Sequence, residues 1–302
     1  MKTLTFGIIK ILLTTFLVAS ITFFLLHIIP GNPFSGNKTL PPEIIANLEA
    51  KYHLNEPIIT QYFLYLSDLL KGNLGPSLKY TNRSVNEILY SALPISFTLG
   101  LLALILAIPF GILTGILSAV LNKKGVGNLL IILVTLGISL PNFLIGALLI
   151  NILGLKFRLL PVALWESPYH VIMPVITLSF LPAAYISRIV RSQMLEQFSE
   201  EYIKTGLAKG LPLSMIVFKH AFKNCTISLI TILGPIVAVL ITGSFVVEYI
   251  FAIPGMGKYF ITAFTNRDYF LITGTTIVFS FILTTLNVAI DAMYKKIDPR
   301  IT

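Results

Sequence analysis

Charged side chains are scarce in this sequence. Asp, Glu, Lys and Arg make up only 12% of its 302 residues, whereas soluble domains carry roughly 25%. Hydrophobic residues make up 55%, so most of the chain is expected to face lipid or other membrane helices. This composition excludes a soluble globular protein, and it also means that the length predicts no domain count.

Cysteines and clustered histidines are also lacking. The single cysteine, Cys225, excludes an internal disulfide framework and a cysteine metal cluster, and it is interpreted as a small apolar residue entering a helix. The histidines are too scattered to form a metal-ligand cluster in sequence, so no metal site is expected. They are His27, His53, His170 and His220.

Catalytic and nucleotide-binding motifs are absent as well. Neither H-E-x-x-H nor G-x-S-x-G occurs. Gly255–Tyr259 superficially resembles a phosphate loop, but Ala252 replaces its first glycine and Tyr259 replaces the Ser or Thr that holds magnesium. The chain is therefore expected to bind no cofactor of its own and not to be an enzyme.

The sequence contains instead six apolar runs that approach or exceed the ~20 residues needed to span a bilayer. The first, Phe6–Ile29, is too long for a signal-peptide core and no cleavage site follows it, so it is predicted to remain as the first transmembrane helix. In the second run, Gly111 and Gly115 are spaced as G-x-x-x-G, a weak signal for close helix packing. The later runs are Leu93–Leu121, Leu129–Leu155, Val171–Ser187, Ile227–Val247 and Tyr269–Ile290.

The sequence thus predicts an all-α polytopic membrane protein with six transmembrane helices in three parts. These are a first transmembrane helix (residues 1–30), an extracytoplasmic loop with short helices (31–92) and a five-helix core (93–302). In the loop, Glu43–Tyr52 is predicted as a short amphipathic helix. A second loop helix is expected to lie on the membrane or cap the bundle rather than act in catalysis. Its apolar and aromatic residues recur at helical spacing: Ile58, Tyr62, Tyr65, Leu66, Leu69 and Leu70.

Lysine and arginine in the short loops set the orientation. They gather in the loops after the second and fourth runs and near both ends of the chain, and such an excess marks the cytoplasmic side. Both termini and residues 200–224 are therefore predicted to be cytoplasmic, and residues 34–92 and 154–170 to be outside. This bias accounts for the net charge of +9 without nucleic acid binding, the alternative that a basic chain raises.

The most informative polar stretch is Glu200–Asn224, between the fourth and fifth runs. Glu201–Lys209 is predicted as a short helix with acidic residues in its first turn and Lys209 in its last, which suits the helix dipole. Gly210 ends this helix, and Pro212 can open a second one. A helix–turn–helix hairpin at a membrane face is predicted, although the composition of the segment alone favours a solvated loop equally.

Residue identity separates these two interpretations. The stretch resembles the coupling loop, or EAA motif, of ABC importer permeases, most closely their dipeptide, oligopeptide and nickel branch, which reads E-D-Y-V-R-T-A-R-A-K-G-L and later R-H-A-L-R-N-A. Two positions depart from the pattern: this chain has Gly206 where the family usually has alanine, and Leu207 where the family usually has arginine. The resemblance makes these residues candidates for coupling to an ATPase: Glu200, Glu201, Tyr202, Thr205, Gly206, Ala208, Lys209, Gly210, His220 and Asn224.

Further motifs of the same branch follow in the same order along the chain. Residues 243–257 resemble G-S-x-V-V-E-x-I-F-x-x-P-G-L-G, which implies a gate or subunit contact at Glu248, Pro254, Gly255 and Gly257. For Glu248, local pairing with Lys258 or Arg267 is the favoured alternative. The stretches Y-I-S-R-I-V-R-S-Q-M-L-E and D-A-M-Y-K-K-I-D-P-R supply candidate cytoplasmic anchors: Arg188, Arg191, Asp291, Asp298 and Arg300.

The resemblance implies a permease subunit of an ATP-driven importer of di- or oligopeptides in the cell membrane. Its expected partners are a second, homologous permease in a heterodimer, two cytoplasmic ATPases that hold ATP and magnesium, and an external solute-binding protein. Nickel or another metal–chelator complex is the alternative solute. An ATP-independent channel or a membrane-embedded enzyme is the alternative class, although the apolar runs are nearly bare of the polar residues that an enzyme needs.

Overall fold

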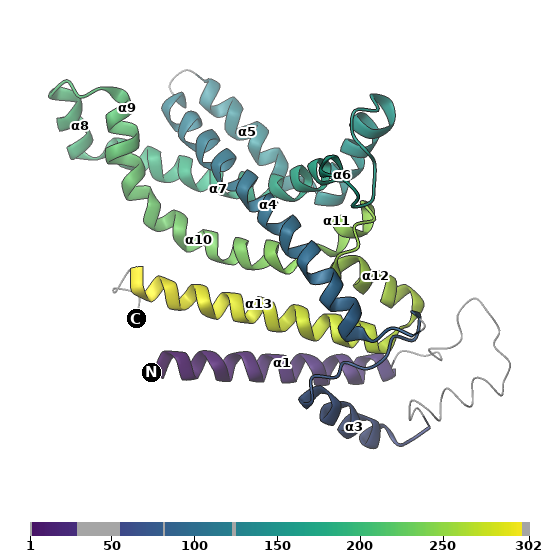
Figure 1. Ribbon diagram of the computed structural model, residues 1–302. Helices are drawn as coiled ribbons and strands as arrows, with labels where there is room; N and C mark the ends of the chain where they lie inside the picture. The colour runs from purple at the N-terminus through teal and green to yellow at the C-terminus, as the bar shows by residue number, and fades with distance from the viewer. Residues whose placement is uncertain (1, 29–54, 81, 123–124, 298–302) are drawn as a thin grey trace. The chain divides into compact units, whose positions relative to one another are not determined.

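A computed structural model describes residues 2–28, 55–80, 82–122 and 125–297 of the chain (Figure 1). These residues are predominantly helical, and the one β pairing among them is an isolated bridge between Pro76 and Ser84. Five of the described helices are long and apolar enough to cross a membrane. The all-α polytopic fold is therefore confirmed, while the predicted helix Glu43–Tyr52 lies outside the described residues.

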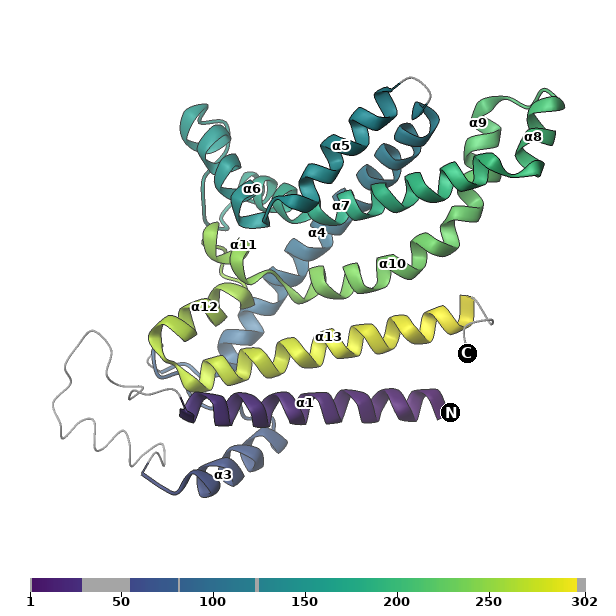
Figure 2. The same ribbon diagram turned by 180° about the vertical axis from the view of Figure 1, so that it is seen from behind.

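The helices form two compact units, of which the first comprises Met1–Ile95 and Pro254–Val288. In this unit α1 and α13 lie side by side (Figure 1, Figure 2), and a β-carbon on Gly7 would lie 2.6 Å from a methyl carbon of Val288. The unit contains α1 (Lys2–Ile28), α3 (Ile58–Leu70), the start of α4 (Val85–Val120), α12 (Met256–Asn266) and most of α13 (Tyr269–Ile297).

The second unit comprises Ser96–Ile253 and Ala289–Thr302. α7 lies at its centre and contacts α5, α6 and α10. Besides the rest of α4, the elements are α5 (Val126–Ser139), α6 (Asn142–Leu149), the π-helix η2 (Ile150–Lys156), α7 (Pro168–Ser199), α8 (Glu201–Ala208), α9 (Leu213–Met215), the π-helix η3 (Ile216–Ala221), α10 (Phe222–Thr242) and α11 (Phe245–Ile250).

Within this unit, α4 approaches α7 through the predicted glycine pair. A β-carbon on Gly111 would lie 2.7 Å from the carbonyl oxygen of Ala183, and one on Gly115 would lie 2.7 Å from that of Ser187. No larger side chain fits at that distance, so the two backbones pack closely because both residues are glycine. The G-x-x-x-G interpretation is confirmed.

Of the predicted transmembrane runs, Leu129–Leu155 is wrong as a single helix, whereas Ile227–Val247 remains a candidate span within Ser228–Ile250 but is interrupted. Leu129–Leu155 is divided into α5 and α6 at Pro141, because a proline has no N–H and disfavours the helical conformation of the residue before it. Ile227–Val247 is interrupted because α10 ends before Gly243, whose φ of 106° does not continue a helix. Glu248 therefore lies on the separate helix α11.

The remaining runs are helical but longer than the apolar stretches that predicted them. Val171–Ser187 is the middle of the 32-residue α7, the second run begins earlier, at Val85, and the sixth continues to Ile297. Hydrophobicity marks the part of a helix that faces lipid, and polar turns extend a helix beyond that part. α12 has no predicted counterpart, since its 11 residues are too few to register as a spanning run.

Candidate functional site

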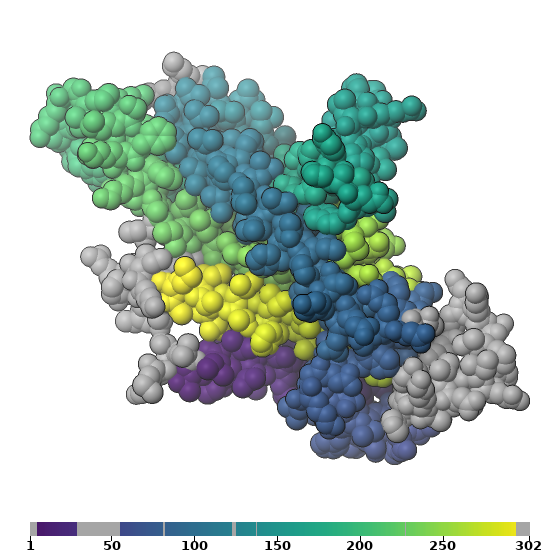
Figure 3. Space-filling model, in the orientation of Figure 1, coloured from purple at the N-terminus to yellow at the C-terminus, as the bar shows by residue number. Residues whose placement is uncertain are grey.

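The segment Glu200–Asn224, named here the hairpin, projects from one end of α7 and α10 and forms the green lobe at the upper left of Figure 3. Glu200 has an extended conformation between α7 and α8, and its carbonyl oxygen accepts the N–H of Ile203 at 3.1 Å to start α8. Gly210 turns the chain with a φ of 75°, and Pro212 precedes α9. The predicted helix–turn–helix is confirmed.

Three polar side chains tie the hairpin to α7. The Tyr202 hydroxyl donates to Gln197 Oε1 at 2.5 Å, and the Asn224 amide donates to the same oxygen at 3.1 Å and to the Tyr202 hydroxyl oxygen at 2.9 Å. These residues belong to α10, α8 and α7, so each helix is linked to the other two. The structure thus brings the predicted residues Tyr202 and Asn224 together around Gln197, which precedes the motif and gave no signal of its own in the sequence.

Apolar packing fixes the hairpin from beneath. Ile203 of α8 and Ile216 of η3 are 3% and 1% exposed, and they share one core cluster with Val190 and Met194 of α7. Cys225 is buried in the same cluster, as expected for a small apolar residue. The hairpin is therefore held to the long helices by both hydrogen bonds and a continuous core.

The outer surface of the hairpin is partly apolar. Leu207, Leu213 and Phe218 are each more than half exposed, although the hairpin lies outside the spanning helices. Exposed apolar side chains that gather on one projecting element indicate a surface for a protein partner. Glu201 pairs with Lys204 at 2.6 Å on the same helix, and both side chains are exposed.

A shallow basic depression adjoins the hydrogen-bonded triangle. It has a volume of about 370 Å³ and is lined by Tyr202, Lys219, His220, Lys223 and Asn224. This lining contains basic groups and no carboxylate, so it is suited to an acidic group of a partner. Predicted residues from both arms of the hairpin, including His220, thus meet at one surface.

The predicted gate residue Glu248 lies elsewhere in the second unit, at the break between α10 and α11. Its side chain is fully buried, and Oε1 accepts the N–H of Ser244 at 3.2 Å. A β-carbon on Gly243 would lie 2.8 Å from the same oxygen, so the glycine leaves room for the carboxylate. Pro254, Gly255 and Gly257 fall in the first unit, where Gly255 precedes α12. A gate or subunit contact at these four residues stays a prediction.

The anchor candidates differ from one another in their surroundings. Arg191 donates through Nη2 to Asn122 Oδ1 at 2.8 Å and to Asn128 Oδ1 at 2.5 Å, and so holds the end of α4 and the start of α5 against α7. Arg188 and Asp291 are exposed. Two further candidates, Asp298 and Arg300, lie outside the described residues.

Comparison with known proteins gives the family. Residues 107–302 match the family described as "Binding-protein-dependent transport system inner membrane component". Residues 1–99 match the N-terminal region of the same membrane components. The chain belongs to this permease family.

Similar permeases cover nearly its whole length. The chain is 41% identical over 288 residues to "Dipeptide transport system permease protein DppB" of Bacillus subtilis (95% of this chain, 94% of the relative). It is 40% identical over 290 residues to "Oligopeptide transport system permease protein OppB" of Haemophilus influenzae (95% of each). A solved structure of the MetNI methionine ABC transporter in inward-facing conformations matches with a TM-score of 0.52 at 15% identity. That match covers 71% of this chain and 96% of the other, and supports the fold alone.

The permease contains a further buried carboxylate, Asp268, that the sequence did not single out. Oδ2 accepts hydrogen bonds from the Ser77 hydroxyl at 2.5 Å and from the N–H groups of Leu78 and Lys79 at 3.0 and 3.2 Å. Oδ1 accepts the N–H of Leu271 at 3.2 Å, in the first turn of α13. Asp268 thereby ties the loop before α4 to the start of α13. Its position immediately before a long apolar run, where aspartate is a preferred cap, was the available signal.

Proposed function

We propose that this permease carries di- or oligopeptides in an ATP-driven importer, and that ATPase subunits act on it through the hairpin. The observation that carries the proposal is that a hairpin with exposed apolar side chains is both hydrogen-bonded to the long helix α7 and packed against it, and is continuous with α10. The names of the relatives DppB and OppB support a peptide as the solute.

The geometry of α8 explains how a push on it moves the transmembrane helices. Glu200 alone separates α7 from α8, and the Tyr202–Asn224 bond links α8 to α10. A displacement of α8 would therefore be transmitted directly to both long helices, α7 and α10. ATP closure of the ATPases then biases the permease between inward-open and outward-open states, which is a two-state equilibrium controlled from a distant site.

The proposal includes partners that complete the transporter. A second, homologous permease forms the solute path with this chain, two ATPases bind ATP and magnesium, and an external binding protein delivers the solute. The hairpin's basic depression and its exposed Leu207, Leu213 and Phe218 supply the two kinds of contact that an ATPase surface would use, charged and apolar.

Reconstitution in liposomes tests this function. With both permeases, the ATPases and the binding protein present, labelled dipeptide should accumulate only when ATP is supplied, and this chain alone should hydrolyse no ATP. Accumulation without the ATPases would indicate a channel instead. Uptake of a nickel chelate but of no peptide would replace the proposed solute, and ATP hydrolysis by the isolated chain would contradict its non-catalytic role.

The proposed topology can be tested with single cysteines. Asn82 is exposed in the loop before α4, and Lys209 is exposed in the hairpin. In a Cys225→Ser background, Asn82→Cys should react with a membrane-impermeant thiol reagent in intact cells, whereas Lys209→Cys should react only after lysis. The Cys225→Ser substitution should itself disturb the structure little, because a serine hydroxyl can keep the hydrogen bond that Cys225 Sγ donates to the Ala221 carbonyl oxygen at 3.3 Å. The opposite labelling pattern would invert the topology.

A further inference from the structure

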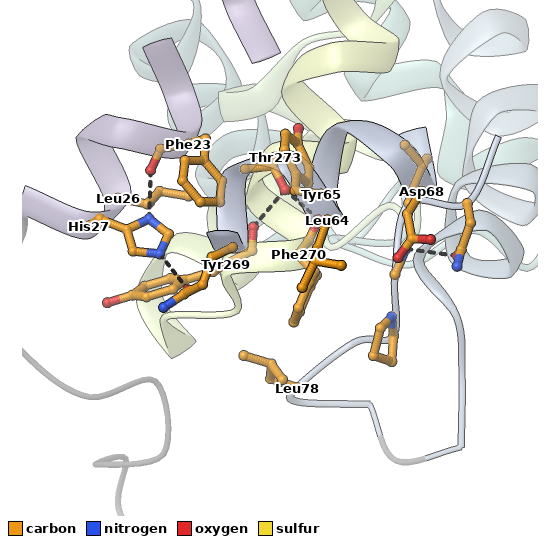
Figure 4. Close-up of a pocket in the computed structure, with 15 residues that line it drawn as sticks. Phe23, Leu26, His27, Leu64, Tyr65, Asp68, Leu78, Tyr269, Phe270 and Thr273 are labelled. Atoms are coloured by element: carbon orange, nitrogen blue, oxygen red, sulfur yellow. Dashed lines mark hydrogen bonds between the residues drawn. The ribbon is translucent and has the colours of Figure 1, made fainter. Parts of the chain in front are cut away.

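The first unit contains a cavity of about 310 Å³ that no part of the transport proposal uses. Figure 4 shows Phe23 and His27 of α1, Tyr65 of α3, and Tyr269 and Phe270 of α13 around it. Cavities that bind small molecules start at about 300 Å³. The space is therefore large enough for a ligand, although small for a bulky one.

The polar groups around the cavity are mostly bonded to the protein itself. His27 donates from Nδ1 to the Phe23 carbonyl oxygen at 2.8 Å and hydrogen-bonds through Nε2 to the Gln61 side chain at 3.1 Å. The Thr273 hydroxyl donates to the Tyr269 and Phe270 carbonyl oxygens at 2.9 and 3.0 Å. What the cavity offers to a ligand is therefore chiefly apolar and aromatic contact.

The neighbouring helix α3 packs against the end of α1. The Tyr62 and Ser20 hydroxyls are 2.7 Å apart, and the Tyr62 ring lies 5.0 Å from that of Phe24. Ser20 precedes the end of α1 at Ile28 by about 12 Å, or two turns, at 1.5 Å per residue. α3 therefore runs beside the last two turns of a helix long enough to span a bilayer.

The exposed face of α3 is apolar. Ile59 and Phe63 are 67% and 64% exposed, and α3 has no fully buried residue. Helices with such an apolar face lie at the boundary of headgroups and acyl chains.

From this position beside a candidate membrane span and from this lining, we propose that the cavity holds an acyl chain of a membrane phospholipid, from the outer leaflet in the proposed topology. The apolar chain packs against Phe23, Tyr269 and Phe270, and the polar headgroup region lies near Gln61, which hydrogen-bonds to His27 at the end of α1. Asp68 lies across the cavity from His27 (Figure 4), where it is half exposed and paired with the Lys71 ammonium at 3.8 Å. A side chain from a protein partner is the competing occupant, and the exposed apolar face of α3 beside a candidate membrane span argues against it.

Photo-crosslinking tests the proposal on the assembled transporter in lipid nanodiscs. The probe is a phosphatidylethanolamine that carries a diazirine on one acyl chain, and the adducts are mapped by mass spectrometry. Adducts are expected on Leu64, Tyr269 and Phe270, which line the cavity. Leu64→Trp should fill the space and remove the adducts on α13.

Leu70→Trp is the matched control, because Leu70 lies on α3, is 89% exposed and does not line the cavity. It should leave the adducts unchanged. If Leu64→Trp does not assemble, Phe270→Ala serves instead, since it enlarges the cavity and should increase labelling of Leu64 and Tyr269. Adducts on Ile59 and Phe63 without any in the cavity would show ordinary surrounding lipid and overturn the proposal. Crosslinking of the cavity to the binding protein instead of lipid would overturn it equally.

Discussion

Gly210→Val should abolish peptide uptake while leaving the chain in the membrane. Gly210 has a φ of 75° at the turn between α8 and α9, a conformation that costs residues with a β-carbon about 1–2 kcal/mol and β-branched residues more. The hairpin would relieve this strain by changing its turn and moving α8. Because no spanning helix contains Gly210, insertion should be normal, whereas uptake and co-purification of the ATPases should fail.

Gly206→Ala is the matched control for this variant. A β-carbon on Gly206 would meet Leu211 at an ordinary 3.4 Å, and alanine favours a helix by about 1 kcal/mol over glycine. Uptake should therefore be retained. Ala208→Trp tests the surface without touching the turn, since Ala208 is exposed on α8, and it should reduce ATPase association. Normal uptake and normal association in both Gly210→Val and Ala208→Trp would reject the hairpin as the coupling element.

Asp268→Ala should destabilise the permease more than any surface change. The substitution removes the acceptor for the Ser77 hydroxyl and for the N–H groups of Leu78, Lys79 and Leu271. Ser77 and Leu271 are buried, and each hydrogen bond to a charged group contributes about 1.5–3 kcal/mol, so a total loss above ~3 kcal/mol is expected. The unfolding midpoint of the detergent-solubilised complex measures it.

Asp68→Ala controls for the loss of a carboxylate in the same unit. Asp68 and Lys71 are exposed and 3.8 Å apart, and such surface pairs contribute about 0–1 kcal/mol. Its unfolding midpoint should barely move. The unfolding midpoint of Asp268→Asn should lie between those of Asp268→Ala and Asp68→Ala, because an amide keeps one acceptor oxygen but points an N–H group toward the donors. If Asp268→Ala unfolds like Asp68→Ala, the loop before α4 is not held by this carboxylate.

Most of the fold could be predicted from the sequence, because the length of an apolar run and the prolines or glycines that end a helix act on the chain locally. The hairpin is an example, since Gly210 and Pro212 define its turn without reference to the rest of the chain. The division of the third run was missed although Pro141 was visible, because prolines inside membrane helices are often accommodated, as Pro174 and Pro182 are in α7. Sequence alone does not say which prolines their neighbours will tolerate.

The candidate site was predictable only in part, for a related reason. Tyr202 and Asn224 came from a motif resemblance, but nothing local revealed that they meet at Gln197, which lies 27 residues from Asn224. Asp268 was missed because its donors come from Ser77, Leu78 and Lys79, about 190 residues earlier in the chain. Side chains whose partners are distant in sequence show no period or spacing, so they emerge only when the chain is folded.

The hydrogen-bonded triangle of Gln197, Tyr202 and Asn224 determines which substitutions this sequence can accept. Three hydrogen bonds join three helices, so the loss of any one side chain still leaves the other two bonded to each other. Tyr202→Phe, for instance, leaves Asn224 donating to Gln197 at 3.1 Å. The polar attachment to α7 therefore survives a substitution of Tyr202 or of Asn224 but not of Gln197, after which the apolar contacts of the buried Ile203 and Ile216 hold the hairpin to α7.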